Sequence, residues 1–349
     1  MSLLTNRGNL KSKTISNDML IAKRTAWLVK HWQEKIGFPY YQTGAAFRQE
    51  KFDAFMKVDD ASSLDFPNRT FKFNNAGLAL AWSYHPHAFN VRCNDSKSPY
   101  DVFNDKVIFS NGVRKTLVGS FFKKQSYETL RSDTEQTKQI IRGILRRVTG
   151  SQMVSNFRPV TASALYKIFT DEGDTVWDMS CGWGGRLLAS IKADVNYIGT
   201  DPNSITQKGL NQMSQTFGNS ARTIELHTMG SEEYRPPKNS LDFAFTSPPY
   251  FDTEKYSDTE TTQSYLKYSN INTWKEEFLR KTLDNVYYGL KQNKFCAFNV
   301  ANVKSYSTFE KDTKQIAQEV GFKFVDTFDL RLSSQQADFK SEPIFIFKK

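Results

Sequence analysis

A hydroxyl, two prolines and an aromatic ring directly follow an apolar run of the chain. The run spans residues 241–245 and leads into Thr246-Ser247-Pro248-Pro249-Tyr250. A continuous apolar run predicts a strand buried on both faces, and two prolines cannot continue it. The Ser247 hydroxyl and the Pro248 carbonyl would then be acceptors at a strand end, beside the ring of Tyr250. Such a strand end can hold a planar group that carries an NH2, although Pro-Pro is also a common exit into a loop.

A glycine-rich turn earlier in the chain predicts a ligand cradle. Residues 174–178 predict a short strand, Gly182-Trp183-Gly184-Gly185 forms the turn, and residues 187–191 predict a helix. A strand, a glycine loop and a helix N-terminus together let the backbone approach a ligand closely. The order of these elements therefore predicts a nucleotide-like cofactor.

The spacing of the turn narrows the choice of cofactor. The third glycine of a dinucleotide fingerprint and the Gly-Lys-Ser/Thr end of a P-loop are both absent after Gly185. The next predicted strand, residues 196–201, ends in Asp201, which is placed to accept hydrogen bonds from ribose hydroxyls. An adenosine without phosphates fits this pattern.

These motifs resemble the S-adenosylmethionine-dependent amino-methyltransferases of nucleic acids, whose hallmark is Ser/Asn/Asp-Pro-Pro-Tyr/Phe. The resemblance runs from Asn156 to the C-terminus. It implies an α/β fold with a Rossmann-like methyltransferase sheet and a terminal antiparallel hairpin, whose strands we expect at residues 322–326 and 343–347. It also implies S-adenosylmethionine as the cofactor, and the N4 amine of cytosine or the N6 amine of adenine in DNA as the target.

The resemblance implies a role for each candidate site residue. The Ser247 hydroxyl and the Pro248 carbonyl would accept the two N–H groups of the target amine and direct its lone pair at the sulfonium methyl, without a covalent intermediate. Tyr250 would stack on a base flipped out of the helix. Asp178 would meet the amino group of the cofactor's methionine part and Asp201 would hold the ribose. The full expected sets are Ser247, Pro248, Pro249 and Tyr250 for catalysis, and Arg158, Pro159, Thr161, Asp178, Ser180, Gly182, Gly184, Gly185, Asp201, Pro202, Gly230 and Ser231 for the cofactor.

The target base stays open in the sequence. Serine in the first motif position favours cytosine, whereas the cofactor loop precedes the Pro-Pro motif, which departs from the commoner cytosine-N4 order. Trp183 also stands where a small residue is usual. The alternatives are an RNA amino-methyltransferase acting on adenine N6 or guanine N2, a protein glutamine methyltransferase, and a non-catalytic nucleic-acid-binding module.

The cysteines and histidines argue against other chemistry. None of Cys93, Cys181 and Cys296 follows a proline, as the nucleophile of a carbon-5 cytosine methyltransferase would, and we expect three buried or incidental thiols. Their scatter disfavours a zinc site, and we expect no metal. The only close histidine pair, His85 and His87, is interpreted as part of a polar loop.

The net charge of +10 is unevenly distributed along the chain. Residues 1–150 hold 24 Lys and Arg against 13 Asp and Glu, whereas residues 151–349 hold 23 against 24. We therefore predict a basic α+β N-terminal region, residues 1–150, that contacts nucleic acid, and a methyltransferase domain, residues 151–349. The expected partner is DNA, with RNA as the alternative. The candidate contacts are Lys138, Arg142 and Arg146, which form a basic ridge on a helix starting at the capping box of residues 132–135, and Tyr256.

Local patterns complete the expectations. Residues 69–73 and 106–109 are predicted as short strands, and Trp32 as a core residue of an amphipathic helix. The polar stretch after Tyr250 predicts a loop of about twenty residues that closes over the flipped base. No segment has the length of a membrane span or the pattern of a secretory signal, and we expect a cytoplasmic protein without a membrane partner.

Overall fold

The computed structural model of the 349-residue chain describes residues 16–120, 123–147, 149–255, 262–333 and 340–349. Its contacts separate two compact units: unit 1 is Met1–Pro39 with Pro99–Ser151, and unit 2 is Tyr40–Ser98 with Gln152–Lys349. This division differs from the boundary after residue 150 that the charge pattern predicts. Residues 40–98 belong to unit 2 because their apolar side chains share a core with the helices of the sheet domain.

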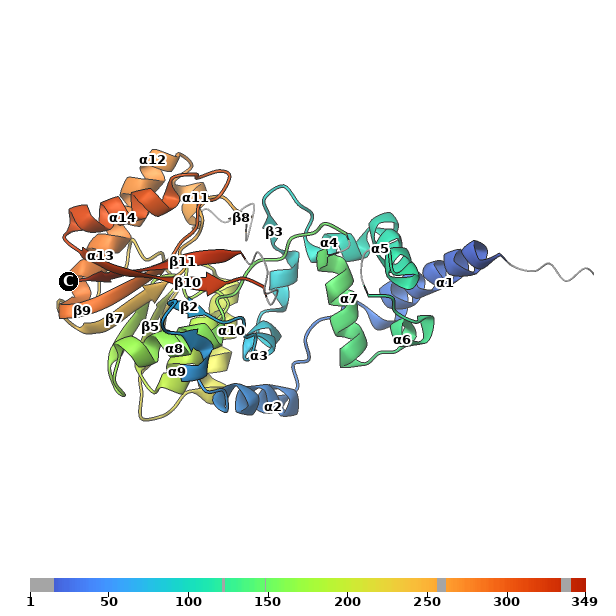
Figure 1. Ribbon diagram of the computed structural model, residues 1–349, viewed down its shortest axis with the longest axis horizontal. Coiled ribbons are helices and arrows are strands. Elements are labelled where there is room, and N and C mark those ends of the chain that lie inside the picture. The colour runs from blue at the N-terminus through green and yellow to red at the C-terminus, as the bar shows by residue number, and fades with distance from the viewer. Residues whose placement is uncertain (1–15, 121–122, 148, 256–261, 334–339) are drawn as a thin grey trace, which may run out of the picture. The chain divides into compact units, whose positions relative to one another are not determined.

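In the residues that the structure describes, unit 1 is helical (Figure 1). Its elements are α1 (Asn17–His31), a π-helical turn (Trp32–Ile36), α4 (Pro99–Asn104), α5 (Lys106–Val118), α6 (Tyr127–Arg131) and α7 (Glu135–Arg147). The expected core position of Trp32 is confirmed, since its side chain is fully buried. The strand predicted at residues 106–109 is wrong, because Asp105 caps a helix there by accepting hydrogen bonds from the backbone N–H groups of Val107 and Ile108.

Unit 1 carries the whole net charge of the protein. It holds 17 Lys and Arg against 7 Asp and Glu, whereas unit 2 holds 30 of each. The strands of the first half of the chain lie in the near-neutral residues 40–98. Residues 1–150 therefore contain both helices and short strands, as expected, but the positive charge is concentrated in the helical unit 1.

Unit 2 is built on a nine-stranded sheet of order β1-β2-β10-β11-β9-β7-β4-β5-β6. Neighbouring strands from β9 to β6 run parallel, whereas β11 runs antiparallel to both β9 and β10. The strands are β1 (Leu64–Asp65), β2 (Thr70–Phe71), β4 (Thr175–Asp178), β5 (Asn196–Thr200), β6 (Ile224–His227), β7 (Leu241–Thr246), β9 (Leu290–Asn299), β10 (Lys323–Arg331) and β11 (Ser341–Lys348). The predicted α/β fold with a terminal antiparallel hairpin is confirmed.

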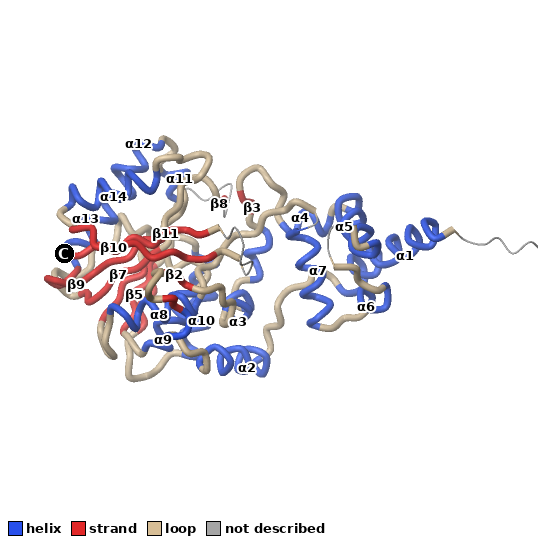
Figure 2. The backbone as a smooth tube through the Cα atoms, viewed as in Figure 1, coloured by secondary structure: helices blue, strands red, loops and turns tan. Residues whose placement is uncertain are grey.

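Two helical layers cover the two faces of the sheet (Figure 2). Along β7, Phe243 and Phe245 belong to one core cluster, and Leu241 and Ala244 belong to the other. Every residue of β7 is buried, as a strand covered on both faces requires. The first layer holds α2 (Ala45–Met56), α3 (Leu78–Ser83), α8 (Pro159–Phe169), α9 (Gly185–Ala193) and α10 (Ser204–Phe217). The second holds α12 (Ile271–Trp274), a π-helical segment (Lys275–Arg280), α13 (Lys281–Gly289) and α14 (Phe309–Val320).

Residues 40–98 extend this sheet and this core. The predicted strand at residues 69–73 is present as β2, which pairs in parallel with β10. A short strand β3 (Arg92–Cys93) pairs with β8 (Glu254–Lys255), and two 3-10 turns span Ala61–Ser63 and Pro86–Asn90. Of the stretch after Tyr250, where we expected a long loop, the structure describes β8 and α11 (Ser264–Lys267), and residues 256–261 lie outside the described residues.

Candidate functional site

The carboxyl ends of β4, β5 and β7 lead into one pocket. These strands are neighbours in the sheet, and Gly182, Asp201 and Ser247 follow their ends. Ligands of open α/β sheets bind at this edge, where loops from parallel strands converge. The predicted site residues that line the pocket are Ser180, Gly182, Asp201, Pro202, Gly230, Ser231, Ser247, Pro248, Pro249 and Tyr250.

The glycines of the turn are required by its backbone. Gly182 and Gly184 adopt φ values of 47° and 79°, in the left-handed region that favours glycine. A Cβ on Gly185 would lie 2.0 Å from the carbonyl oxygen of Phe157, so only glycine lets the start of α9 approach residues 156–157. Gly184 and Gly185 are therefore packing positions behind the pocket, whereas Gly182 reaches its wall.

Asp201 presents a buried carboxylate to the pocket. Its Oδ2 accepts a hydrogen bond of 3.0 Å from the Gly182 N–H, and its Oδ1 accepts one of 2.9 Å from the Asn203 N–H. Burial raises the pKa of Asp201 to about 6. Each oxygen keeps a lone pair beyond the backbone bond it accepts, so the carboxylate can also receive hydroxyl donors.

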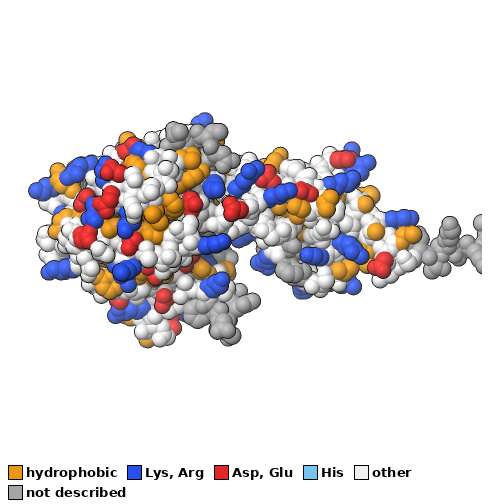
Figure 3. All heavy atoms as spheres, turned by 90° about the horizontal axis from the view of Figure 1, so that it is seen from above, with side chains coloured by type: hydrophobic (Ala, Val, Ile, Leu, Met, Phe, Trp, Pro, Cys, Tyr) orange, Lys and Arg blue, Asp and Glu red, His pale blue; other side chains and the backbone are white. Residues whose placement is uncertain are grey.

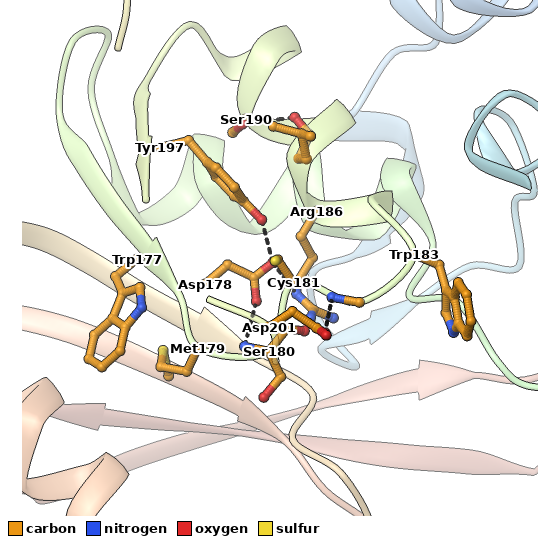
Figure 4. A network of polar contacts seen from close by, with 12 residues as sticks. Trp177, Asp178, Met179, Ser180, Cys181, Trp183, Arg186, Ser190, Tyr197 and Asp201 are labelled. Carbon is orange, nitrogen blue, oxygen red and sulfur yellow. Dashed lines mark hydrogen bonds and ion pairs between the residues drawn. The ribbon is translucent and has the colours of Figure 1, made fainter. Parts of the chain in front are cut away.

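Asp178 lies behind the pocket in a buried ion pair (Figure 4). Its Oδ2 accepts hydrogen bonds from Arg186 Nε at 2.8 Å and from the Tyr197 hydroxyl at 2.7 Å, and its Oδ1 accepts one from the Ser180 N–H at 3.3 Å. Burial lowers the pKa of Arg186, but the Asp178 carboxylate more than compensates and keeps it above its ordinary value. The expected contact of Asp178 with a cofactor is thus not supported, because its carboxylate is fully buried and does not line the pocket.

Residues 156–161, around the start of α8, lie partly at the pocket and partly away from it. Asn156 and Phe157 line the pocket, but Arg158, Pro159 and Thr161 do not. The Arg158 guanidinium donates to the carbonyl oxygens of Arg331 and Leu332. Pro159 begins α8 and packs where a Cβ of Gly77 would be, and Thr161 is buried. Arg158 and Pro159 thus contact neighbouring elements, and none of the three residues lines the pocket, so their expected role at a cofactor stays a prediction.

The Ser-Pro-Pro-Tyr segment is held from outside the pocket. The Tyr250 hydroxyl donates to the Asn299 carbonyl oxygen at 3.3 Å, and its ring meets that of Phe309 edge to face at 5.6 Å. Pro248 is buried, whereas Ser247 is half-buried. The sequence anticipated the ring beside the acceptors but not this anchoring, which joins the ends of two strands to α14.

Glu232 is a pocket residue that directly follows Gly230 and Ser231, two residues expected at the cofactor. Its Oε1 accepts hydrogen bonds from Lys267 Nζ at 2.8 Å and from the Tyr268 hydroxyl at 3.2 Å. Its Oε2 is buried and has no hydrogen-bond partner among the described residues. A buried carboxylate oxygen without a donor is a binding position for an N–H group. Lys267 also pairs with Glu233, so these contacts tie α11 to the loop after β6.

An aromatic cluster explains Trp183, the unusual residue of the glycine turn. Its ring lies 5.2 Å from that of His87, and 5.7 Å from those of His85 and Trp82. Interpreting His85 and His87 as a polar loop is wrong: His85 is fully buried, and burial lowers the pKa of both imidazoles to about 4. A Cβ on Gly209 would lie 2.6 Å from His85 Nε2, so the histidine packs directly on α10. Trp183 thus docks residues 82–87 beside the pocket.

The basic ridge predicted on α7 is not a free cationic surface. Arg142 is buried and donates to the Pro39 carbonyl oxygen at 3.0 Å and to Glu135 Oε1 at 2.6 Å. Lys138 pairs with Asp133 at 2.9 Å, and only Arg146 of the three is exposed. Helical spacing identified a common side of α7 but not which part of that side faces the core of unit 1. Tyr256 lies outside the described residues.

We expect Arg142→Ala to destabilise unit 1 by about 2 kcal/mol, because it removes two hydrogen bonds of a buried charge. Urea unfolding measures this change. As a control, Arg146→Ala at an exposed position should change the free energy of unfolding by no more than about 0.5 kcal/mol. Both stability changes are expected in the absence of nucleic acid. If Arg142→Ala kept the wild-type stability but bound DNA with a weaker salt dependence, Arg142 would contact DNA as the sequence predicted.

The three cysteines are buried thiols, as expected. No cluster of three or more His, Cys, Asp or Glu suited to a metal occurs among the described residues. No helix in the described part of the chain has the length and apolar character to cross a membrane.

No family model and no curated protein sequence matches the chain. Solved structures similar to it include a SAM-dependent methyltransferase from Methanosarcina mazei, with 13% identity over 53% of this chain and 96% of that chain, at a TM-score of 0.38. A TehB-like SAM-dependent methyltransferase from Corynebacterium glutamicum has 13% identity over 62% and 97% of the two chains, at a TM-score of 0.38. The [4+2]-cyclase SpnF has 11% identity over 56% and 84%, at a TM-score of 0.41. These likenesses are distant and concern the fold alone.

Proposed function

We propose that this protein transfers a methyl group from S-adenosylmethionine to an exocyclic amine of a base in DNA, either cytosine N4 or adenine N6. The observation that carries the proposal is one shared pocket. The acceptors of Ser247 and Pro248 and the ring of Tyr250 line the same cavity as Gly182 and Asp201. Two motifs far apart in the sequence thus meet at one edge of the sheet, an amine-holding strand end and an adenosine-type cradle.

The residues present fit the proposed cofactor. The buried carboxylate of Asp201 would accept the ribose hydroxyls, and the partnerless Oε2 of Glu232 would accept an N–H group of the adenine. Gly182 lets the turn approach the ligand without a side chain in the way. Bound in this cradle, S-adenosylmethionine would supply an electrophilic methyl group on a sulfonium.

The chain's own residues would then activate the amine. The lone pair of an exocyclic amine is delocalised into the base, so the nitrogen is a poor nucleophile. Ser247 and the Pro248 carbonyl would accept its two N–H groups and favour a pyramidal nitrogen, while Tyr250 stacks on the base. Preorganised acceptors and fixed positions of this kind lower barriers by several kcal/mol.

RNA is the second candidate substrate, because the same strand end can hold an adenine N6 or guanine N2 amine. A protein glutamine substrate is disfavoured, since unit 1 carries all of the net charge of +10 and suits a polyanion. A non-catalytic binding module is disfavoured by the intact acceptors at Ser247 and the carboxylate at Asp201.

The direct test incubates the protein with isotope-labelled S-adenosylmethionine and with DNA and RNA in separate reactions. Mass spectrometry of the digested nucleosides should reveal N4-methylcytosine or N6-methyladenine from the DNA. Label in RNA alone would favour the second candidate. No transfer to any amine, together with no cofactor binding by calorimetry, would refute the enzymatic proposal.

Asp201→Asn should weaken cofactor binding and remove a pH dependence of the protein's stability. Because the folded-state pKa of about 6 lies above the ordinary 3.8, the carboxylate destabilises the fold above pH 6, and this cost disappears as pH falls towards 4. We expect the variant to lose this pH dependence of stability between pH 4.5 and 7.5 and to bind the cofactor at least 10-fold more weakly. Thermal unfolding at pH 7.5 and 4.5 and calorimetry measure both, with exposed Asp171→Asn as control. Unchanged cofactor affinity would remove Asp201 from the site.

A further inference from the structure

An exposed aromatic and cationic cluster lies on unit 1, away from the residues that we first considered. The Trp27 ring of α1 stacks on His31 at 4.5 Å, and it meets Tyr127 of α6 edge-on at 5.6 Å. The guanidinium of Arg131 lies 5.7 Å from the Trp27 ring, and that of Arg24 lies 5.2 Å from the Tyr127 ring. We call these five residues the Trp27 cluster.

Whereas Tyr127 of the cluster packs against the edge of the core of unit 1, Trp27 itself lies outside that core. On the same helix, Leu28, Val29 and the adjoining Trp32 are fully buried in that core. Trp27 itself is 42% exposed, whereas the other tryptophans of the chain are at most 7% exposed. A tryptophan side chain exposed to this extent is typical of a surface that contacts a ligand or partner rather than of a protein core.

Positive charge surrounds the cluster. Unit 1 carries the full net charge of +10, and blue side chains outnumber red ones over its visible face in Figure 3. Arg24 makes no ion pair with a described residue, and Lys23 beside it is exposed. The nearby acids are paired, Glu128 with Arg131 at 3.0 Å and Glu34 with Lys30 at 3.8 Å. All four side chains are at least 50% exposed, so these ion pairs are weak, and a phosphate can replace the Glu128 carboxylate on Arg131. The remaining acid of α1 is Asp18 in its first turn.

We propose that the Trp27 cluster binds a single-stranded segment of nucleic acid, with an unpaired base on the Trp27 ring and phosphates on Arg24 and Arg131. Aromatic rings beside guanidinium groups in a basic surface are the elements of such a platform, because every base has a stacking face and every phosphate a charge. The identity of the partner rests on the proposed function. A base taken out of its duplex for amine chemistry leaves its partner base unpaired, and enzymes that modify bases also act on single-stranded substrates.

The test measures binding of labelled oligo-dT and oligo-U to the full chain by fluorescence anisotropy, without cofactor. Failure of methyl transfer is therefore distinguishable from failure of this inference. Trp27→Ala should weaken binding by about 5- to 150-fold, the range for loss of one stacked base. Trp27→Phe, which keeps an aromatic face, should restore most of the affinity. Since the other tryptophans are buried, oligonucleotide should quench the fluorescence of the wild type more than that of Trp27→Phe.

Variants that remove positive charge test whether nucleic acid contacts Arg24 and Arg131 directly or responds only to the net charge of the protein. The double variant Arg24→Gln with Arg131→Gln should reduce the slope of log K against log salt by about 1.4, or about 0.7 for each lost phosphate contact. The control Lys323→Gln removes one positive charge from exposed β10 in unit 2 and should leave the slope unchanged. Circular dichroism verifies folding of each variant. Equal affinities and slopes for folded cluster variants and wild type would overturn the proposal and leave the cluster to a protein contact.

Discussion

Ser247→Ala is expected to lower kcat for methyl transfer by about 100-fold while the Kd of the cofactor stays within about 2-fold, because an acceptor that acts on the amine in the transition state is lost. Single-turnover transfer to a DNA substrate measures the rate, and calorimetry measures the affinity. Ser247 is half-buried and lines the pocket, so removal of its hydroxyl should change stability little.

Tyr250 supplies the matched comparison for Ser247. Tyr250→Phe keeps the ring against Phe309 and loses the hydrogen bond to the Asn299 carbonyl, so turnover should fall less than about 5-fold. Tyr250→Ala should lose turnover on the scale of Ser247→Ala, because the stacking face is gone. If Ser247→Ala turned over at the wild-type rate, the strand end would be an ordinary exit into a loop.

Asp178→Ala should destabilise unit 2 by about 3 to 5 kcal/mol, the largest stability effect that we expect, because it leaves the Arg186 guanidinium buried without its carboxylate. The Tyr197 hydroxyl and the Ser180 N–H would lose their acceptor as well. Urea unfolding followed by tryptophan fluorescence measures the loss.

A double variant tests whether the charge alone is responsible. Asp178→Leu combined with Arg186→Met removes both partners and should recover a large part of the stability, since an apolar pair of similar volume often replaces a buried ion pair well. If Asp178→Asn instead weakened the cofactor at wild-type stability, Asp178 would have to contact the ligand after all, as the sequence resemblance implied.

Much of the fold could be predicted because local chemistry decided it. The run ending at Thr246 is a fully buried strand, the turn at Gly182 has the backbone that glycine favours, and the predicted terminal hairpin is present as β10 and β11. The prediction at residues 106–109 failed for a physical reason. An apolar run of that length suits a strand or a helix equally, and the capping carboxylate of Asp105 favours the helix.

The sequence predicted the place of some site residues and not of others. Asp201 and Ser247 follow strand ends directly, so their place at one sheet edge follows from the parallel topology. Arg158 and Asp178 lie next to the same elements, but their side chains point to the core and to neighbouring backbone. Glu232 was missed as a site residue because the donors that hold it, from Lys267 and Tyr268, lie in a later segment.

The sequence by itself determined which functional groups this protein can offer: a hydroxyl and a carbonyl acceptor at a strand end, a glycine turn, an aspartate after the next strand, and an uneven distribution of positive charge. Those properties belong to residue types and short spacings. The tertiary structure decided which charged side chains are available to a ligand. Arg142, Asp178 and Arg158 are buried and engaged by other groups of the protein, whereas Asp201 and Glu232 line the pocket and Trp27 is exposed. The tertiary structure decides this because the environment of a side chain is set by segments distant in the sequence.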